Sequence, residues 1–195
     1  VKAVCGCSQG ETIILLDRGG NPLRPAIVWY DNRSRAEAEE LKAVVDPEEL
    51  YRTTGILEME PTWSAPKLLW VKRHEPRVFD RIWKILLVED YIVYRLTGRT
   101  VTSTSLVSTS ALVDIHEKKY WDATVGYIGA GGMLPEIVEE TAVIGTVSPG
   151  VAAELGLKSG VAVVKGSMDH DMGAIGVGNI KPGILTETTG SALAM

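Results

Sequence analysis

One short stretch near the end of the chain constrains the fold most strongly. Residues 161–164 are an apolar Val-Ala-Val-Val run, residues 166–174 read Gly-Ser-Met-Asp-His-Asp-Met-Gly-Ala, and a segment of Gly, Ala, Ile and Val follows. This order predicts a buried strand, a tight turn and a buried helix. A turn of this kind lies at the carboxyl end of a sheet, where open α/β folds bind ligands. Asp169 is therefore a candidate base that faces a bound ligand.

Size and charge limit the classes of partner. The chain has 195 residues, of which 45% are hydrophobic, and a net charge of −5. It is long enough for one large domain or two small ones with a sizeable core. Because no cluster of Lys and Arg is present, we expect no nucleic-acid partner. Because neither a run of about 18 apolar residues nor a signal peptide is visible, we expect no membrane partner.

The chain contains two cysteines, Cys5 and Cys7. Their spacing on an expected strand places both side chains on one face. Two ligands without a nearby His are too few for a zinc site. We interpret them as packed thiols in a reducing compartment, which predicts a cytoplasmic location.

Local signals predict the other elements. A buried strand is expected over residues 1–8, and further strands over residues 12–17 and 25–30, the last two joined as a hairpin. Residues 33–45 favour a helix, and Asp46 followed by Pro47 predicts the start of the next one. Further helices are expected from residue 64, over 88–96 with a stop at Gly98, over 120–128, and after residue 148.

These elements predict an α/β fold in which core strands flank a largely helical insertion over about residues 33–140. Within it, residues 100–110 are dense in Ser and Thr. They indicate either an alternation of strand and loop or hydroxyls that line a polar pocket. Gly173, Gly176 and Gly178 do not have the dinucleotide-binding order, and we interpret them as close packing of a helix on the sheet. The chain starts without Met inside an expected strand, so we expect a segment of a longer polypeptide.

Several segments resemble one protein family. Residues 8–12, Ser-Gln-Gly-Glu-Thr, and residues 26–33, Ala-Ile-Val-Trp-Tyr-Asp-Asn-Arg, resemble the FGGY carbohydrate kinases, which include the glycerol kinases and xylulokinases. Further segments resemble the family in the same order, at residues 65–70, 89–98, 133–136, 166–174 and 190–191. The resemblance implies the ribonuclease H-like, actin-like ATPase fold, whose two domains close over ATP and a ketose or polyol.

The resemblance also implies a domain division and a reaction. Residues 1–183 would form the sugar-binding domain without its N-terminal phosphate-loop hairpin, and residues 184–195 would start the nucleotide-binding domain. The expected activity is ATP-dependent phosphorylation of a ketose or polyol with Mg²⁺, by the longer parent chain rather than by this segment alone. A homodimer is the implied assembly.

The family implies a role for each of several positions. Asp169 would be the catalytic acid/base, with His170 beside it against the sugar. Gln9, Gly10 and Glu11 would form a sugar-binding turn. Trp29 and Asp31 would wall the pocket, and Gly190 and Ser191 would approach the ATP phosphates. Position 10 carries Arg in glycerol kinases and Met in xylulokinases, so Gly10 would leave more room or one contact fewer. Glu11 resembles the glycerol-kinase choice, and the substrate stays open.

Structural alternatives exist for most of these residues. Asp169 could cap a helix, and a first-turn acid such as Asp171 is favoured by the helix dipole alone. Trp29 could be a core residue, and Asp31 could pair with Arg33.

Two functional alternatives differ in class. One is a sugar-binding or regulatory module that lacks the kinase parts. The other is a different actin-like ATPase. Residues 29–33, Trp-Tyr-Asp-Asn-Arg, argue against this alternative.

Overall fold

The structure is a computed structural model, which describes residues 1–189 and 193–194. Its strands are β1 (Ala3–Ser8), β2 (Ile14–Leu16), β3 (Lys84–Leu86), β4 (Val101–Ser103), β5 (Val113–Asp114), β6 (Lys119–Tyr120), β7 (Glu136–Val138), β8 (Val143–Thr146), β9 (Ala162–Met168), β10 (Thr188–Thr189) and β11 (Leu193–Ala194). Its helices are α1 (Arg35–Val44), α2 (Pro47–Thr54), α3 (Ser64–His74), α4 (Pro76–Phe79), α5 (Val88–Thr97), α6 (Thr104–Val107), the 3₁₀ turn Ser108–Ser110, α7 (Asp122–Ile128), α8 (Pro149–Glu154) and α9 (Asp169–Gly176).

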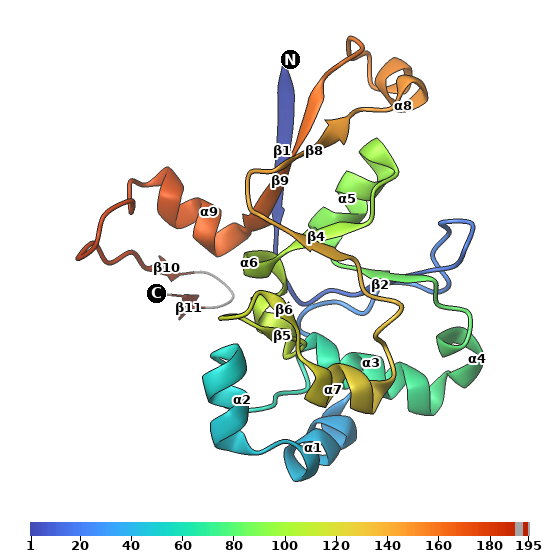
Figure 1. The fold of residues 1–195 in the computed structure, drawn as a ribbon, viewed down its shortest axis with the longest axis vertical. Helices are drawn as coiled ribbons and strands as arrows, with labels where there is room; N and C mark the ends of the chain where they lie inside the picture. The colour runs from blue at the N-terminus through green and yellow to red at the C-terminus, as the bar shows by residue number, and fades with distance from the viewer. Residues whose placement is uncertain (190–192, 195) are drawn as a thin grey trace.

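A three-stranded sheet in the order β1-β9-β8 organises one end of the molecule (Figure 1). β1 runs parallel to β9, and β8 runs antiparallel to β9. Helix α5 packs against both β1 and β9. Smaller pairs join β2 to β3 and β4 to β7. The expected mixed α/β class is confirmed, and α1 to α7 all lie within residues 33–140.

The buried side chains form two clusters. The larger one joins the helical end to β2 through residues such as Leu15, Leu41, Leu68 and Ile128. The smaller one lies between α5 and the sheet and includes Val93, Ile144 and Val163. Figure 1 shows the sheet at one end and α1 to α3 at the other, with α5 between them.

Helix boundaries follow the predicted signals closely. The Asp46 carboxylate accepts hydrogen bonds from the backbone N–H of Glu48 and Glu49, both at 3.0 Å, so it caps α2 as expected. Gly98 ends α5 with a φ of 78°, a left-handed conformation that glycine adopts at little cost. Among the described residues, no helix is both long and apolar enough to cross a membrane.

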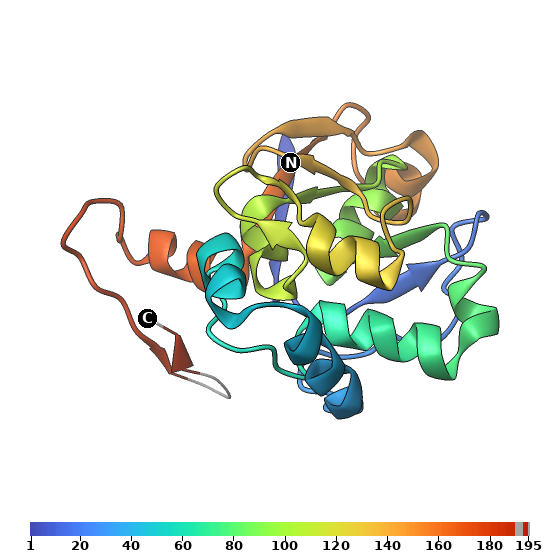
Figure 2. The same cartoon turned by 60° about the horizontal axis from the view of Figure 1, so that its bottom comes forward.

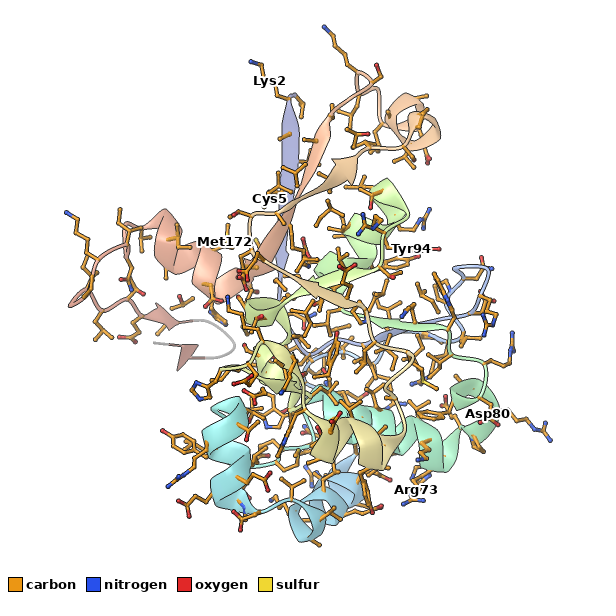
Figure 3. The ribbon with its side chains drawn as sticks, in the orientation of Figure 1. Lys2, Cys5, Arg73, Asp80, Tyr94 and Met172 are labelled. Carbon is orange, nitrogen blue, oxygen red and sulfur yellow. The ribbon has the colours of Figure 1, made fainter. Side chains whose placement is uncertain are left out.

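Three predictions about the strands and thiols are wrong. Residues 25–30 form no strand, because only an isolated bridge joins Ile27 to Ile13. β1 lies at an edge of its sheet, and alternate side chains along it are exposed rather than buried. Cys5 and Cys7 share one face as expected, but that face is exposed, so they are not packed thiols. Figure 3 shows Cys5 on β1.

Helix α9 also differs from the expectation. None of its residues is buried, and Ile175 is 54% exposed. A Cβ atom added at Gly173 or Gly176 would meet no atom within 4 Å, so these glycines do not pack α9 on the sheet. Both views show α9 and residues 177–189 leading away from the rest of the molecule (Figures 1 and 2).

Candidate functional site

The ends of two parallel strands define the candidate site. Ser8, the last residue of β1, pairs in register with Met168, the last residue of β9. The turn after β1, residues 9–12, and the first turn of α9 therefore begin at the same edge of the sheet, the one formed by the carboxyl ends of β1 and β9. This is the edge at which open α/β folds bind ligands, as the sequence pattern predicted.

Asp169 is exposed at this edge. It is the first residue of α9, one position after the N-cap position, which Met168 occupies. Its Oδ1 accepts a hydrogen bond from the backbone N–H of His170 at 2.9 Å. His170 itself is partly buried beside it. Because Met168 and not Asp169 holds the N-cap position, the structure does not show the capping role considered for Asp169, and its exposed carboxylate can meet a ligand.

The Gln9 side chain holds the turn after β1. Its Oε1 accepts hydrogen bonds from the backbone N–H of Glu11 at 2.9 Å and of Thr12 at 3.0 Å, and its Nε2 donates to Thr12 Oγ1 at 2.6 Å. Thr12 Oγ1 also accepts from the backbone N–H of Trp29 at 3.0 Å. The two segments expected to bind sugar are therefore joined directly.

Of the two alternatives for Gly10, more room or one contact fewer, the structure does not show more room. A Cβ atom at this position would lie 2.4 Å from the carbonyl oxygen of Leu106 and 2.9 Å from Thr109 Oγ1. Helix α6 and the 3₁₀ turn after it fill the space that a side chain would need. Gly10 is thus required by close approach of the backbone, and any contact it makes with a ligand would come from its main chain.

Lys67 is the residue at this site that the sequence analysis missed. Its side chain is fully buried, and its Nζ donates to the carbonyl oxygens of Glu11 at 3.1 Å and of Trp29 at 3.0 Å. Burial lowers the pKa of Lys67 to about 8. One signal was visible: this lysine lies in the apolar stretch of residues 65–69, where a surface helix would place apolar side chains.

Trp29 and Asp31 lie in a turn beyond this link. Trp29 is half-buried, and its ring meets that of Tyr30 edge to face, with centroids 5.3 Å apart. Arg33 Nε and Nη2 donate to the two Asp31 carboxylate oxygens at 2.9 and 2.8 Å, so the alternative of an Asp31–Arg33 pair is what the structure shows. This guanidinium holds the pKa of Asp31 below its usual range.

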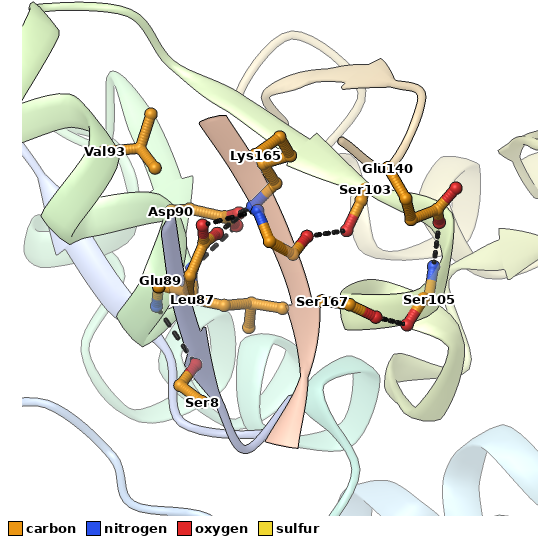
Figure 4. Close-up of polar contacts among 12 residues, drawn as sticks. Ser8, Leu87, Glu89, Asp90, Val93, Ser103, Ser105, Glu140, Lys165 and Ser167 are labelled. Atoms are coloured by element: carbon orange, nitrogen blue, oxygen red, sulfur yellow. Dashed lines mark hydrogen bonds and ion pairs between the residues drawn. The ribbon is translucent and has the colours of Figure 1, made fainter. Parts of the chain in front are cut away.

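A second buried lysine holds the strand that leads to Asp169. Lys165 Nζ contacts the Glu89 carboxylate and lies 2.7 Å from Asp90 Oδ1, with all three side chains buried (Figure 4). Glu89 Oε1 also accepts from the backbone N–H of Gly166 at 3.1 Å. Burial raises the pKa of both carboxyls. These contacts, made by Lys165 and Gly166, attach β9 to α5 four and three residues before the candidate base.

The hydroxyl-rich segment anchors the same strand from the other side. Ser103 Oγ donates to the carbonyl oxygen of Gly166 at 3.1 Å. Ser105 Oγ contacts Ser167 Oγ, and Ser105 N–H donates to Glu140 Oε1 at 2.9 Å (Figure 4). Ser105 Oγ also contacts Asp171 Oδ2. Residues 100–110 form β4, α6 and a 3₁₀ turn, and these hydroxyls bind protein groups. Asp171 is held by two serines, which agrees with the structural role considered for it.

Gly190 and Ser191, the residues expected to approach the ATP phosphates, lie outside the described residues. Across residues 1–189 and 193–194, no three His, Cys, Asp or Glu side chains gather closely enough to hold a metal ion. Asp169, His170, Gln9, Gly10 and Glu11 lie on turns at the same sheet edge, and Trp29 is joined to that edge through Thr12 and Lys67.

Comparison with known proteins defines the class. The profile described as "FGGY family of carbohydrate kinases, N-terminal domain" matches residues 1–176. The chain belongs to this family. Within it, the similarity is to xylulose kinases: the xylulose kinase of Escherichia coli (strain K12) is 36% identical over 181 residues, which cover 92% of this chain and 37% of that protein.

Solved structures agree with this assignment. The xylulose kinase from Rhodospirillum rubrum matches with a TM-score of 0.88 and 31% identity over 93% of this chain and 37% of that one. A gluconate kinase from Lactobacillus acidophilus matches with a TM-score of 0.84 and 27% identity over 91% of this chain and 36% of that one. The chain therefore spans little more than a third of the length of these relatives.

Proposed function

We propose that the polypeptide carrying this chain transfers the γ-phosphoryl group of ATP to a hydroxyl of a ketose or polyol, with a pentulose or hexulose such as xylulose as the first candidate. The observation that carries the proposal is the exposed Asp169 carboxylate at the ends of paired β1 and β9, beside the turn of residues 9–12. The similarity to xylulose kinases supports the substrate class.

In the proposed reaction, Asp169 accepts the proton of the attacking sugar hydroxyl. The hydroxyl oxygen forms a bond to the γ-phosphorus, the bond from that phosphorus to the β–γ bridging oxygen breaks, and ADP leaves. Phosphoryl transfer needs positioning and charge stabilisation more than covalent help from the protein. Mg²⁺ arrives with the ATP phosphates as part of the co-substrate, and Gly190 and Ser191 are proposed to approach those phosphates.

The proposed sugar contacts come from both linked turns. Gln9 and Glu11 would contact the sugar from the turn after β1, where Gln9 is partly buried and Glu11 is 8% exposed, and His170 lies next to the base. The half-buried indole of Trp29 can pack on the C–H face of a sugar, which buries apolar area on both partners. Arg33 binds both carboxylate oxygens of Asp31. We therefore assign the Asp31–Arg33 ion pair, and not a free Asp31 carboxylate, to the wall of the pocket.

We also propose the domain division and assembly that the family implies. Residues 1–183 would form the sugar-binding domain of ribonuclease H-like fold, with its helical insertion, and residues 184–195 would begin the nucleotide-binding domain. The assembly would be a homodimer.

Phosphorylation of a panel of pentuloses, hexuloses and polyols tests the proposal. The Asp169→Asn variant should turn over about 10²–10⁴-fold more slowly, which is the usual contribution of a general base. Asp122→Asn makes the same change in the first turn of α7, away from β9, and should keep the wild-type rate. Sugar binding without ADP formation would instead support a binding or regulatory module, and wild-type turnover by Asp169→Asn would remove this residue from the mechanism.

A further inference from the structure

The fully buried ammonium of Lys67 joins two turns that are distant in sequence. It donates one hydrogen bond to the carbonyl oxygen of Glu11 and another to that of Trp29. Both are residues whose side chains the proposed function places against the sugar. Lys67 comes from α3, whose buried residues belong to the large hydrophobic cluster, so the link ties both turns to the packed core of the helical end.

The surroundings of this ammonium are unusual for a structural lysine. In the described part of the chain it forms no ion pair, and the charged groups that act on it are the Glu11 and Asp31 carboxylates, one on each turn. A buried charge without a bonded counter-ion is costly, and such groups concentrate at functional sites. Glu11 and Asp31 thus place one acid on each of the two turns that the Lys67 ammonium joins.

We propose that Lys67 is a positioning residue for sugar binding: it sets the spacing between the Glu11 turn and the Trp29 turn, so that both side chains reach the same ligand. The inference rests on the proposed function and adds a residue that contacts no substrate. Because a preorganised site binds more tightly than one that must be ordered by its ligand, loss of the link should weaken sugar affinity rather than slow the chemical step.

Helix α3 supplies a matched control. Lys72 Nζ donates to the carbonyl oxygens of Ile128 at 2.6 Å and of Tyr127 at 3.4 Å, so it also joins α3 to another element by ammonium–carbonyl bonds. Those bonds lead to α7 and not to the sheet edge. Lys67→Met and Lys72→Met therefore remove comparable bonds, and only the first removes them from the candidate site.

The experiment measures KM and kcat for the best sugar of the panel, with the polypeptide that carries this chain. We expect Lys67→Met to raise the sugar KM by about tenfold or more and to change kcat by less than about threefold. Lys72→Met should leave KM within about twofold of the wild-type value, although it lowers the melting temperature. Equal KM changes in the two variants, or an unchanged KM in Lys67→Met, would overturn the proposal.

Two further measurements keep the test decisive. The wild-type sugar KM should rise as the pH passes about 8, because the Lys67 amine then loses its attraction to Glu11 and Asp31; a flat profile between pH 7 and pH 9 counts against the link. Hydrogen exchange needs no activity: in Lys67→Met, backbone amides of residues 11–12 and 29–31 should exchange at least about tenfold faster. If no sugar is phosphorylated but exchange increases, the proposed function fails and the link stands; if exchange is unchanged, the link fails.

Discussion

Lys67 and Lys165 are both fully buried, but the groups that bind their ammonium groups differ in charge. At the sheet, Lys165 contacts the carboxylates of Glu89 and Asp90, so the buried positive charge is more than neutralised. At the candidate site, Lys67 has two carbonyl oxygens as hydrogen-bond partners. The Lys165 cluster therefore has two carboxylates for one ammonium group, whereas the Lys67 ammonium group is bound by uncharged carbonyl oxygens.

We infer from this difference that the Lys165 cluster stabilises the sheet, whereas the Lys67 link serves the candidate site. Breaking a buried ion pair leaves unpaired charges, so the Lys165 cluster is expected to hold β9 and α5 together against unfolding. The Lys67 link lies where the proposed ligand binds, and its buried cation opposes folding instead of supporting it. Stability measurements should therefore respond most to Lys165, and ligand affinity should respond most to Lys67.

The largest expected effect comes from Lys165→Met. The substitution leaves the carboxylates of Glu89 and Asp90 buried together without a cation, so the free energy of unfolding should fall by about 3–5 kcal/mol. Urea unfolding at pH 7 measures the change. Lys158→Met, at an exposed position after α8, should change stability by less than about 0.5 kcal/mol. A loss below about 1 kcal/mol in Lys165→Met would show that the cluster does not hold the sheet.

The pH dependence of stability tests the contrast from the Lys67 side. Burial lowers its pKa from 10.5 to about 8, so between these pH values the unfolded chain binds a proton that the folded chain has released. Stability from this group therefore rises with pH across that window, by about 3 kcal/mol at most. The free energy of unfolding of the wild type, relative to Lys67→Met, should increase between pH 8 and pH 10.5. A relative decrease over that range would contradict the buried-cation description.

Local patterns predicted much of the framework in advance. Asp46 with Pro47 marked the start of α2, and Gly98 marked the end of α5, because capping depends on neighbours within a few residues. The strand and turn that lead to Asp169 could be predicted for the same reason. The mixed α/β class followed from the order of these elements.

The features that were missed depend on distant partners. Lys67 binds residues 56 and 38 positions away, and Lys165 binds acids 76 and 75 positions away. The apolar neighbours of Lys67 in the sequence indicate that it is buried, but they do not identify the carbonyl groups that it binds. The exposure of β1 likewise depends on which strands lie beside it, and the lack of space at Gly10 depends on the carbonyl of Leu106.

A smaller effect is expected at Gly10, next to the Lys67 link. The added Cβ of Gly10→Ala would lie 2.4 Å from a backbone oxygen, so the turn or α6 must shift. We expect a loss of about 1–3 kcal/mol in the free energy of unfolding. Gly132→Ala, where a Cβ would meet no atom within 4 Å, is the control and should cost less. If the two variants were equally stable, the close approach at Gly10 would be refuted.

The smallest expected effect, and the one that sharpens the contrast most, comes from Asp90→Asn. This variant leaves Lys165 facing one carboxylate, so the excess buried negative charge disappears and one hydrogen bond is lost. The free energy of unfolding at pH 7 should therefore fall by about 1 kcal/mol. Burial raises the pKa of Asp90, so the folded wild type binds a proton that the unfolded chain releases, and this group's contribution to stability falls as the pH rises above the unfolded pKa. The wild type should therefore exceed Asp90→Asn by more at pH 5 than at pH 7, as urea unfolding at both pH values would show. An advantage that grows with pH would mean that the Asp90 carboxylate is stabilised by Lys165 more than it is penalised by burial.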